Sequence, residues 1–363
     1  MMVTSSSPNA FRALVSGQRR GLTARLTRGL LQAIAVPYAA VMTVRNRAYD
    51  AGWLSVHRVA VPVVSVGNLT LGGTGKTPLV RWLVEWCQRE AIRVGVVSRG
   101  YRATAGQLSD EARELAIWSP HTPYRQNPDR VAAARTAIHE AGCQLIVLDD
   151  ALQHRRLHRD LNLVLLDALL PFGFEHVFPR GLLREPLVGL RRADVVLLSR
   201  ADAVDAGQRQ AIRARVRTLA PQAAWVETVH RPQCLLTPTG QRYPLDSLRG
   251  RTVAAFCGIG NPAGFHHTLE SCGCAIAGLR EFPDHHAYTV ADMRALHTWA
   301  AELAGEAALV CTLKDLVRVP PEPPDAPPLW ALAIDLEMQE GGDGLEERLR
   351  SLLRRADVNR PVP

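Results

Sequence analysis

The chain has 363 residues, of which 47% are apolar and 21% are charged, and its formal net charge is +8 at pH 7. This length allows two separate cores, and the composition is typical of soluble globular proteins. Residues 1–58 carry most of the positive charge, with eight arginines and one acidic residue, Asp50. The rest is close to neutral, which argues against a general nucleic-acid face and favours a local membrane-facing or anion-binding N-terminus.

The first predicted element is an apolar N-terminal helix. Residues 30–44 (LLQAIAVPYAAVMTV) are uncharged, contain Pro37 and are flanked by arginines on both sides. The run is too short to span a bilayer, which takes about 20 residues. It suits a helix lying in a membrane interface. A buried core helix and a targeting peptide are the two alternatives that the pattern leaves open.

Short apolar runs rich in β-branched residues then alternate with helical patterns. Between the first two runs, the apolar residues of 78–90 have the spacing of a helix. The runs are residues 61–67, 94–100, 144–150, 162–168 and 194–200. Because they are continuously apolar, both faces should be buried, which predicts a mostly parallel sheet covered by helices. After a hairpin-like connector, a second α/β series is predicted from runs at 252–260, 274–279, 307–313 and 329–336, with helices at 291–303 and 344–356.

These patterns predict an α/β fold with a P-loop-type sheet and a smaller second α/β domain. The predicted parts are a membrane-associating segment (1–58), a nucleotide-binding domain (59–228), a linker (229–250), a second domain (251–340) and a C-terminal helix with its tail (341–363). The seven cysteines contain no C-x-x-C pair. We therefore expect reduced thiols, mostly in the core, as in an intracellular protein.

A glycine-rich loop follows the first strand in the sequence VGNLTLGGTGKTP, residues 66–78. Gly72, Gly73, Thr74 and Gly75 can turn backbone N–H groups toward one anion at the start of the next helix. Lys76 would reach the outer phosphates of a nucleotide, and Thr77 would bind Mg²⁺. The general pattern has a glycine where this chain has Thr70, which is acceptable if its φ angle is negative. A glycine-rich turn without a ligand is the alternative.

Acidic and histidine residues mark further candidate sites. Asp149 and Asp150 end a strand, where a P-loop protein needs a carboxylate for its metal, although turn or cap roles are common there. Asp110, in SDEA (109–112), is a candidate base, but the pattern by itself favours helix capping, with Ser109 or Asp110 at the N-cap. His285 follows Asp284 in FPDHHAYT, a pairing that is more often structural.

Arg184 and Glu185 lie between prolines in GLLREPL (181–187). They could clamp phosphate and metal, or form a surface ion pair.

Together these motifs resemble the tetraacyldisaccharide 4'-kinase (lipid A 4'-kinase) family over residues 60–315. The motifs are VGNLTLGGTGKTP, VVSRGY (96–101), SDEA, DDALQHRRLHRDLNLVLLDA (149–168), GLLREPL, GIGNP (258–262), FPDHHAYT and TLKD (312–315). The family loop also lacks the early glycine, so Thr70 matches it. The chain departs from the family at Ser109, at Ala151 and in FPRGLLRE (178–185), which could alter turns near the site.

The resemblance implies an ATP- and Mg²⁺-dependent kinase that phosphorylates the 4'-hydroxyl of an acylated glucosamine disaccharide 1-phosphate. By position, Lys76, Thr77 and Arg184 would contact nucleotide, and Thr77, Asp149, Asp150 and Glu185 would supply metal ligands. Asp110 and His285 would activate the sugar hydroxyl, with two domains closing around both substrates. Residues 30–44 would dock on an anionic membrane surface at the cytoplasmic face of the inner membrane. Neither nucleic acid nor an obligate protein partner is expected.

Two other functions remain open at this point. A regulatory GTPase or metallochaperone would read guanine near residues 195–202, where Ser199 and Arg200 replace the usual Asn-Lys. A nonenzymatic membrane adaptor would use nucleotide for structure alone.

Overall fold

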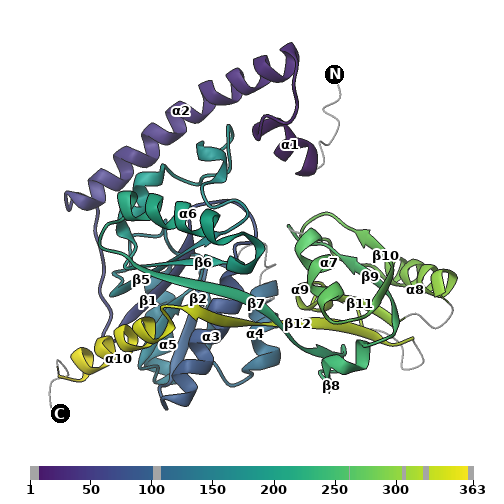
Figure 1. Ribbon diagram of the computed structural model, residues 1–363. Helices are drawn as coiled ribbons and strands as arrows, with labels where there is room; N and C mark the ends of the chain where they lie inside the picture. The colour runs from purple at the N-terminus through teal and green to yellow at the C-terminus, as the bar shows by residue number, and fades with distance from the viewer. Residues whose placement is uncertain (1–7, 101–107, 261, 305–307, 322–326, 359–363) are drawn as a thin grey trace. The chain divides into compact units, whose positions relative to one another are not determined.

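The computed structural model describes residues 8–100, 108–260, 262–304, 308–321 and 327–358. The chain divides into two compact units (Figure 1). Unit 1 comprises Met1–Tyr101, Thr122–Val229 and Glu337–Pro363, and unit 2 comprises Arg102–His121 and His230–Leu336. Tyr101 and Asn261, which belong to two of the family motifs, lie outside the described residues.

Unit 1 contains a parallel sheet with the strand order β7-β6-β5-β1-β4-β2-β3. Its strands are β1 (Val63–Asn68), β2 (Val94–Ser98), β3 (Tyr124–Gln126), β4 (Leu145–Leu148), β5 (Leu161–Asp167), β6 (Val195–Ser199) and the first part of β7 (Ala224–Leu236). The pairs Val63↔Ile146 and Val64↔Leu161 fix the register of the central strand β1 against β4 and β5. The predicted strands and their parallel arrangement are confirmed.

The continuous apolar runs form these strands because both faces of the sheet are covered. Every residue of β1, β2, β4 and β6 is buried. The helices of unit 1 are α1 (Pro8–Val15), α2 (Leu22–Asp50), α3 (Lys76–Arg89), α5 (Arg130–Ala141), α6 (Ala206–Leu219) and α10 (Gly342–Val358). Residues of α2 and α6 pack in a core with Val164 and Val196, and residues of α5 pack in a second core with Ile146 and Leu148.

The predicted N-terminal helix is α2, which extends well beyond residues 30–44 and contains Pro37 within its length. Figure 1 shows it as a long helix along one side of unit 1. Only Ala24 and Ala35 are buried, so the core-helix alternative is wrong. None of the helices in the described parts of the chain is both long and apolar enough to cross a bilayer.

Unit 2 contains parallel strands in the order β10-β9-β11-β12. The elements are α4 (Asp110–Trp118), β8 (Arg242–Tyr243), β9 (Thr252–Cys257), α7 (Pro262–Ser271), β10 (Ala275–Glu281), α8 (Val290–Ala304), β11 (Ala308–Thr312), α9 (Leu313–Leu316) and β12 (Leu329–Glu340). The predicted hairpin is present, since β8 pairs antiparallel with the end of β7. The core is built around Phe256, Leu296 and Leu309.

One part of the predicted domain division needs correction. Residues 108–121 were assigned by sequence to the nucleotide-binding domain, but they belong to unit 2. The reason is packing, because Ile117 and Trp118 of α4 contact the core of unit 2. Trp118 also lies under the guanidinium of Arg242, 4.6 Å from the ring centroid. Similarly, residues 337–340 at the end of β12 belong to unit 1.

Four of the seven cysteines are buried, as predicted for core residues. None forms a disulfide in the described residues, and Cys87, Cys143, Cys257 and Cys311 are buried. Burial, with a smaller contribution from Glu90, raises the pKa of Cys87 to about 12, so this thiol is protonated at neutral pH.

Candidate functional site

The glycine-rich loop connects β1 to α3 in the arrangement expected of a phosphate-binding loop. Gly72 (φ 111°) and Gly75 (φ 87°) occupy the left-handed region that side chains disfavour. Thr70 does not have a positive φ, so its side chain causes no strain there. Its carbonyl accepts a hydrogen bond from Asn68 Nδ2 at 2.7 Å. The loop therefore closes without an early glycine.

The loop is suited to an anionic ligand. α3 begins directly after Gly75, which has no side chain to cap the first N–H groups of the helix. Open space surrounds Gly73, because a Cβ there would meet nothing within 4 Å. The helix dipole adds attraction for a phosphate at this end. These features fit a nucleotide phosphate chain.

Lys76, Asp150 and Arg184 form one charged group beside the loop. Lys76 Nζ lies 3.4 Å from Asp150 Oδ1 and 3.2 Å from Asn68 Oδ1. Arg184 Nη1 contacts both oxygens of Asp150, at 2.7 and 2.8 Å. Burial alone would raise the pKa of Asp150. The positive charges of Lys76 and Arg184 lower it by a larger amount, so the net pKa lies well below the usual value. The carboxylate is therefore ionised, as a metal ligand must be.

Asp150 adopts a positive φ of 50°, which is uncommon for a residue with a side chain. The preceding residue, Asp149, is buried, and its N–H donates to Val97 O at 2.9 Å. Both predicted acids thus lie at the carboxyl end of β4, the end of a parallel strand at which ligands bind in open α/β sheets.

Glu185 has no exposed surface, and both of its oxygens accept hydrogen bonds. The donors are Asn46 Nδ2 (2.7 Å), Gln153 Nε2 (3.0 Å) and Arg192 Nη2 (2.6 Å). In the described residues, no group of three or more His, Cys, Asp or Glu side chains is arranged to hold a metal ion. Mg²⁺ does not need such a group, because it commonly binds one or two carboxylates together with nucleotide phosphates. Direct binding by Glu185 stays a prediction.

Ser199 and Arg200 stand where a GTPase would recognise guanine. In this structure both residues contact the phosphate-binding loop. Ser199 Oγ, which is buried, donates to Thr74 O at 2.8 Å. Arg200 Nη2 donates to Gly73 O at 2.9 Å, and its Nε donates to Asp167 Oδ1 at 3.0 Å. Arg200 also has a positive φ of 55°. These residues support the loop backbone, a role that sequence inspection missed.

The inner side of α2 is attached to the same region. Tyr38 Oη donates to Arg184 O at 2.9 Å, and Arg45 Nη2 donates to Gln153 O at 2.9 Å. In the third contact, Asn46 Nδ2 donates to Glu185 Oε2. The N-terminal helix therefore holds the segment that carries Arg184 and Glu185.

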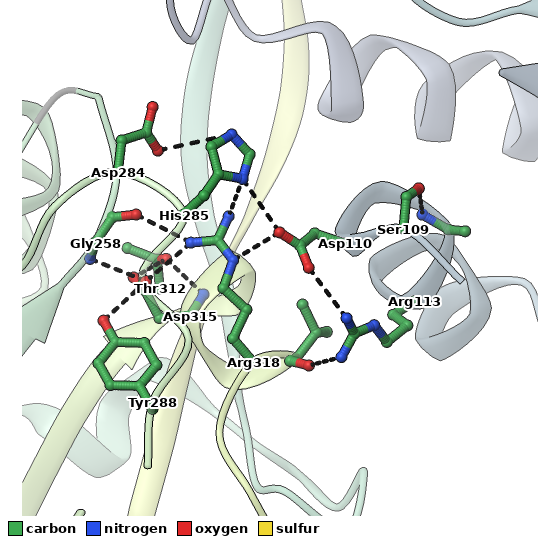
Figure 2. Close-up of polar contacts among 12 residues, drawn as sticks. Ser109, Asp110, Arg113, Gly258, Asp284, His285, Tyr288, Thr312, Asp315 and Arg318 are labelled. Carbon is green, nitrogen blue, oxygen red and sulfur yellow. Dashed lines mark hydrogen bonds and ion pairs between the residues drawn. The ribbon is translucent and has the colours of Figure 1, made fainter. Parts of the chain in front are cut away.

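Asp110 and His285 come together in unit 2, although 175 positions separate them in the sequence (Figure 2). His285 Nδ1 lies 3.2 Å from Asp110 Oδ2. Ser109 Oγ caps α4 by accepting from Ala112 N at 3.3 Å, which leaves the Asp110 side chain available for other contacts. The capping interpretation of SDEA is confirmed at Ser109, whereas the role of Asp110 as a base stays a prediction, although its side chain faces the histidine.

Two arginines join this pair. Arg318 Nε donates to Asp110 Oδ2 at 2.7 Å, and Arg113 Nη2 donates to Oδ1 at 3.3 Å. Burial raises the pKa of Asp110, but the surrounding hydrogen-bond donors and the positive charges of Arg318 and Arg113 lower it by more, so the net pKa lies well below its usual value. Arg318 was not predicted from the sequence, where it follows TLKD by only three residues.

The two adjacent histidines have different surroundings. His285 adopts a positive φ of 63°, whereas His286 packs against Phe282 and Tyr288. His286 Nε2 also lies 3.2 Å from Asp292 Oδ2 at the start of α8. Only His285 faces Asp110, so His286 fits a structural role.

Comparison with known proteins agrees with this geometry. Residues 27–354 match the LpxK family, described as tetraacyldisaccharide-1-P 4'-kinase. A tetraacyldisaccharide 4'-kinase from Anaeromyxobacter sp. (strain K) is 38% identical over 365 aligned positions, covering 95% of this chain and 96% of that protein. The chain belongs to the tetraacyldisaccharide-1-P 4'-kinase family.

Other members of the 4'-kinase family support the assignment. The protein of that name from Desulfatibacillum aliphaticivorans is 36% identical, with 91% of this chain and 94% of the relative covered. The crystal structure of LpxK from Aquifex aeolicus in complex with ATP has a TM-score of 0.72 and 27% identity. It covers 90% of this chain and 99% of that one.

The departures from the family motif cause no visible disruption in the structure. Ser109 serves as the cap of α4. Ala151 is completely buried, and its N–H donates to Val66 O at 3.1 Å. In FPRGLLRE, Arg180 Nη1 donates to Val15 O at 3.0 Å. The charged residues that follow keep the contacts described above.

Proposed function

We propose that the chain transfers the γ-phosphoryl group of ATP to the 4'-hydroxyl of a tetraacylated glucosamine disaccharide 1-phosphate, a lipid A precursor. The observation that carries the proposal is family membership across nearly the whole chain, and it is supported by the glycine-rich loop and by the contact between Asp110 and His285. The contacts of Ser199 and Arg200 with the loop backbone speak against guanine recognition by these residues.

Nucleotide binding is assigned to unit 1. Gly72, Gly73, Thr74 and Gly75 present backbone N–H groups to the phosphates. Lys76 and Arg184, which both contact Asp150, balance the negative charge that spreads over the transferred group. A bound Mg²⁺ would supply positive charge to neutralise the nucleotide phosphates. Thr77, Asp149 and Asp150 would hold it, with Glu185 as a further candidate ligand.

Activation of the acceptor is assigned to unit 2. Asp110 accepts or orients the proton of the sugar hydroxyl, and His285 assists it from 3.2 Å away. The loose transition state of phosphoryl transfer requires little help from a strong base. A carboxylate that stays ionised at all physiological pH values can therefore fill this role, mainly by orienting the nucleophile.

The exposed face of α2 is proposed to dock on an anionic membrane surface, where the acylated substrate resides. Large apolar side chains along one side of the helix are exposed, among them Leu22 (72%), Leu26 and Leu30 (64% each) and Val44 (64%). The arginines that flank residues 30–44 would pair with acidic headgroups. The cytoplasmic leaflet of the inner membrane, where ATP is available, is the proposed location.

The catalytic proposal is tested with γ-labelled ATP, Mg²⁺ and the detergent-dispersed acceptor lipid. Wild-type protein should label the lipid. Lys76→Ala should label it at least about 100-fold more slowly, because one preorganised charge on the transferred group is lost. The matched control is Arg89→Ala, an exposed cation at the other end of α3, which should keep wild-type rates. Equal rates for the Lys76 variant and wild type would refute the role of the loop.

A further inference from the structure

A buried arginine, Arg318, connects the two members of the Asp110–His285 pair. Its Nε donates to Asp110 Oδ2 at 2.7 Å, and its Nη2 lies 3.0 Å from His285 Nδ1 (Figure 2). Only 4% of the Arg318 side chain is exposed. One planar guanidinium therefore contacts both residues, with a different nitrogen facing each of them.

The third nitrogen of Arg318 is anchored in the interior of unit 2. Nη1 donates to Gly258 O at 3.0 Å and lies 3.5 Å from Asp315 Oδ1. Asp315 has no exposed surface, and it is fixed by Gly258 N (2.9 Å), Tyr288 Oη (3.1 Å) and Thr312 Oγ1 (2.6 Å). This network restricts the position of the guanidinium, so Arg318 acts as a rigid support.

The contact between Arg318 and the histidine ring restricts the location of the ring proton. Arginine carries only donors, so the short Nη2 contact requires Nδ1 of His285 to accept. The neutral ring then carries its proton on Nε2, the nitrogen that lies 4.0 Å from Asp284 Oδ1. In this tautomer His285 Nδ1 and Asp110 Oδ2 both accept from Arg318, whereas a proton on Nδ1 would donate to Asp110 but oppose the N–H of Arg318.

The charges around Asp110 come from every element that faces it. Arg113 lies on α4 itself, His285 and Asp284 lie in the segment after β10, and Arg318 follows α9. Of the two arginines, Arg113 is 44% exposed at its side chain, whereas Arg318 is buried. The buried charge is screened less by water, so Arg318 has the larger influence on the carboxylate.

We propose that Arg318 is a positioning residue for phosphoryl transfer, which orders Asp110 and His285 relative to each other. The inference rests on the proposed function of the same pair. Charge alone does not suffice for this role, because three nitrogens of one plane contact three different partners. A lysine carries the charge but cannot reproduce the planar arrangement.

The test compares full-length wild type with Arg318→Gln and Arg318→Lys. Arg318→Gln should lower kcat by about 100-fold with little change in KM for ATP, because the base is misplaced while the nucleotide site is intact. The acid limb of the kcat/KM profile should move up by about 1–2 pH units, because the pKa of Asp110 rises when the cation is removed. Arg318→Lys should restore much of the acid limb but not kcat. Arg249→Gln, a surface arginine of unit 2, should match wild type.

A second measurement does not depend on turnover. In protein with ¹⁵N-labelled histidine, the ring signals of His285, identified by their loss in His285→Gln, should report the Nε2–H tautomer in wild type. They should change in Arg318→Gln. Failure of wild type to phosphorylate the lipid would refute the proposed function but would leave this result standing.

Three outcomes would overturn the role of Arg318. The first is a wild-type ring proton on Nδ1. The second is a loss of kcat without movement of the acid limb, which indicates a structural effect alone. The third is full activity of Arg318→Gln or full rescue by lysine. If Arg318→Gln does not fold, the lysine variant decides, because full activity in that variant refutes the requirement for a planar group.

Discussion

If the exposed apolar face of α2 docks on a membrane, polar substitutions on that face should weaken vesicle binding by a predictable amount. The perturbation is the triple substitution Leu26→Gln/Leu30→Gln/Ile34→Gln. These side chains are 64%, 64% and 51% exposed, so their removal should not disturb the interior of unit 1. Glutamine is a good helix former, which keeps α2 intact.

The magnitude follows from the exposed area. Complete burial of a leucine or isoleucine side chain contributes about 1.5–3 kcal/mol. With half to two-thirds of each side chain available, the three residues should contribute about 3–5 kcal/mol to binding if the membrane covers them. Since about 1.4 kcal/mol corresponds to a tenfold change, vesicle affinity should fall by at least about 100-fold.

The assay is cosedimentation with vesicles of phosphatidylcholine containing phosphatidylglycerol, measured at low and high salt. The matched control is Leu26→Met/Leu30→Met/Ile34→Met, which keeps the apolar area and should bind like wild type. Salt should weaken binding of all three proteins by screening the flanking arginines. If the glutamine variant binds as tightly as wild type, α2 does not insert its apolar face and the proposed docking surface is wrong.

Three further predictions concern the loop and the pair in unit 2. Gly67→Ala should destabilise unit 1 by about 1–3 kcal/mol, since a Cβ there would lie 2.6 Å from Leu152 Cβ; an unchanged midpoint of thermal unfolding would contradict this packing. Ser199→Ala should lower the free energy of unfolding by about 1–3 kcal/mol and reduce the stabilisation of the protein by bound ATP. The control Thr228→Val removes a buried hydroxyl that donates to Leu198 O, and it should lower stability without changing the stabilisation by ATP. Equal ATP responses would show that the Ser199 contact does not support the loop. The folded-state pKa of Asp110 lies below its usual value, so its interactions stabilise the fold fully above about pH 4 and are lost as the pH falls through the folded-state pKa. The difference in unfolding free energy between wild type and Asp110→Asn should therefore be constant from pH 7 to about pH 5 and shrink in more acidic urea titrations; a constant difference at all pH values would argue against ionised Asp110 in the fold.

The sheet could be predicted because its signal is local. Buried parallel strands are continuous apolar runs, and the predicted run at 194–200 contains β6 within one residue at each end. The loop was equally readable, because the glycines and Lys76 are neighbours in sequence. Short β3 and the alanine-rich α5 were missed, since neither shows a strong apolar period.

The arrangement around Asp110 could not be derived from local pattern. Arg318 lies 208 positions away from Asp110 and was recognisable only through its place after the TLKD motif. The assignment of 108–121 to unit 2 has the same cause, since Trp118 packs against residues far along the chain. Motif resemblance paired Asp110 with His285, but only the structure shows the arginine between them.

The most direct test of the account is transfer to an acceptor that lacks one hydroxyl. Wild-type protein with γ-labelled ATP and Mg²⁺ would be given the tetraacylated disaccharide 1-phosphate or its 4'-deoxy analogue. Labelled product is expected from the first lipid and none from the second, because Asp110 and His285 act on the 4'-hydroxyl. Equal labelling of both lipids, or no labelling of the native acceptor, would contradict it.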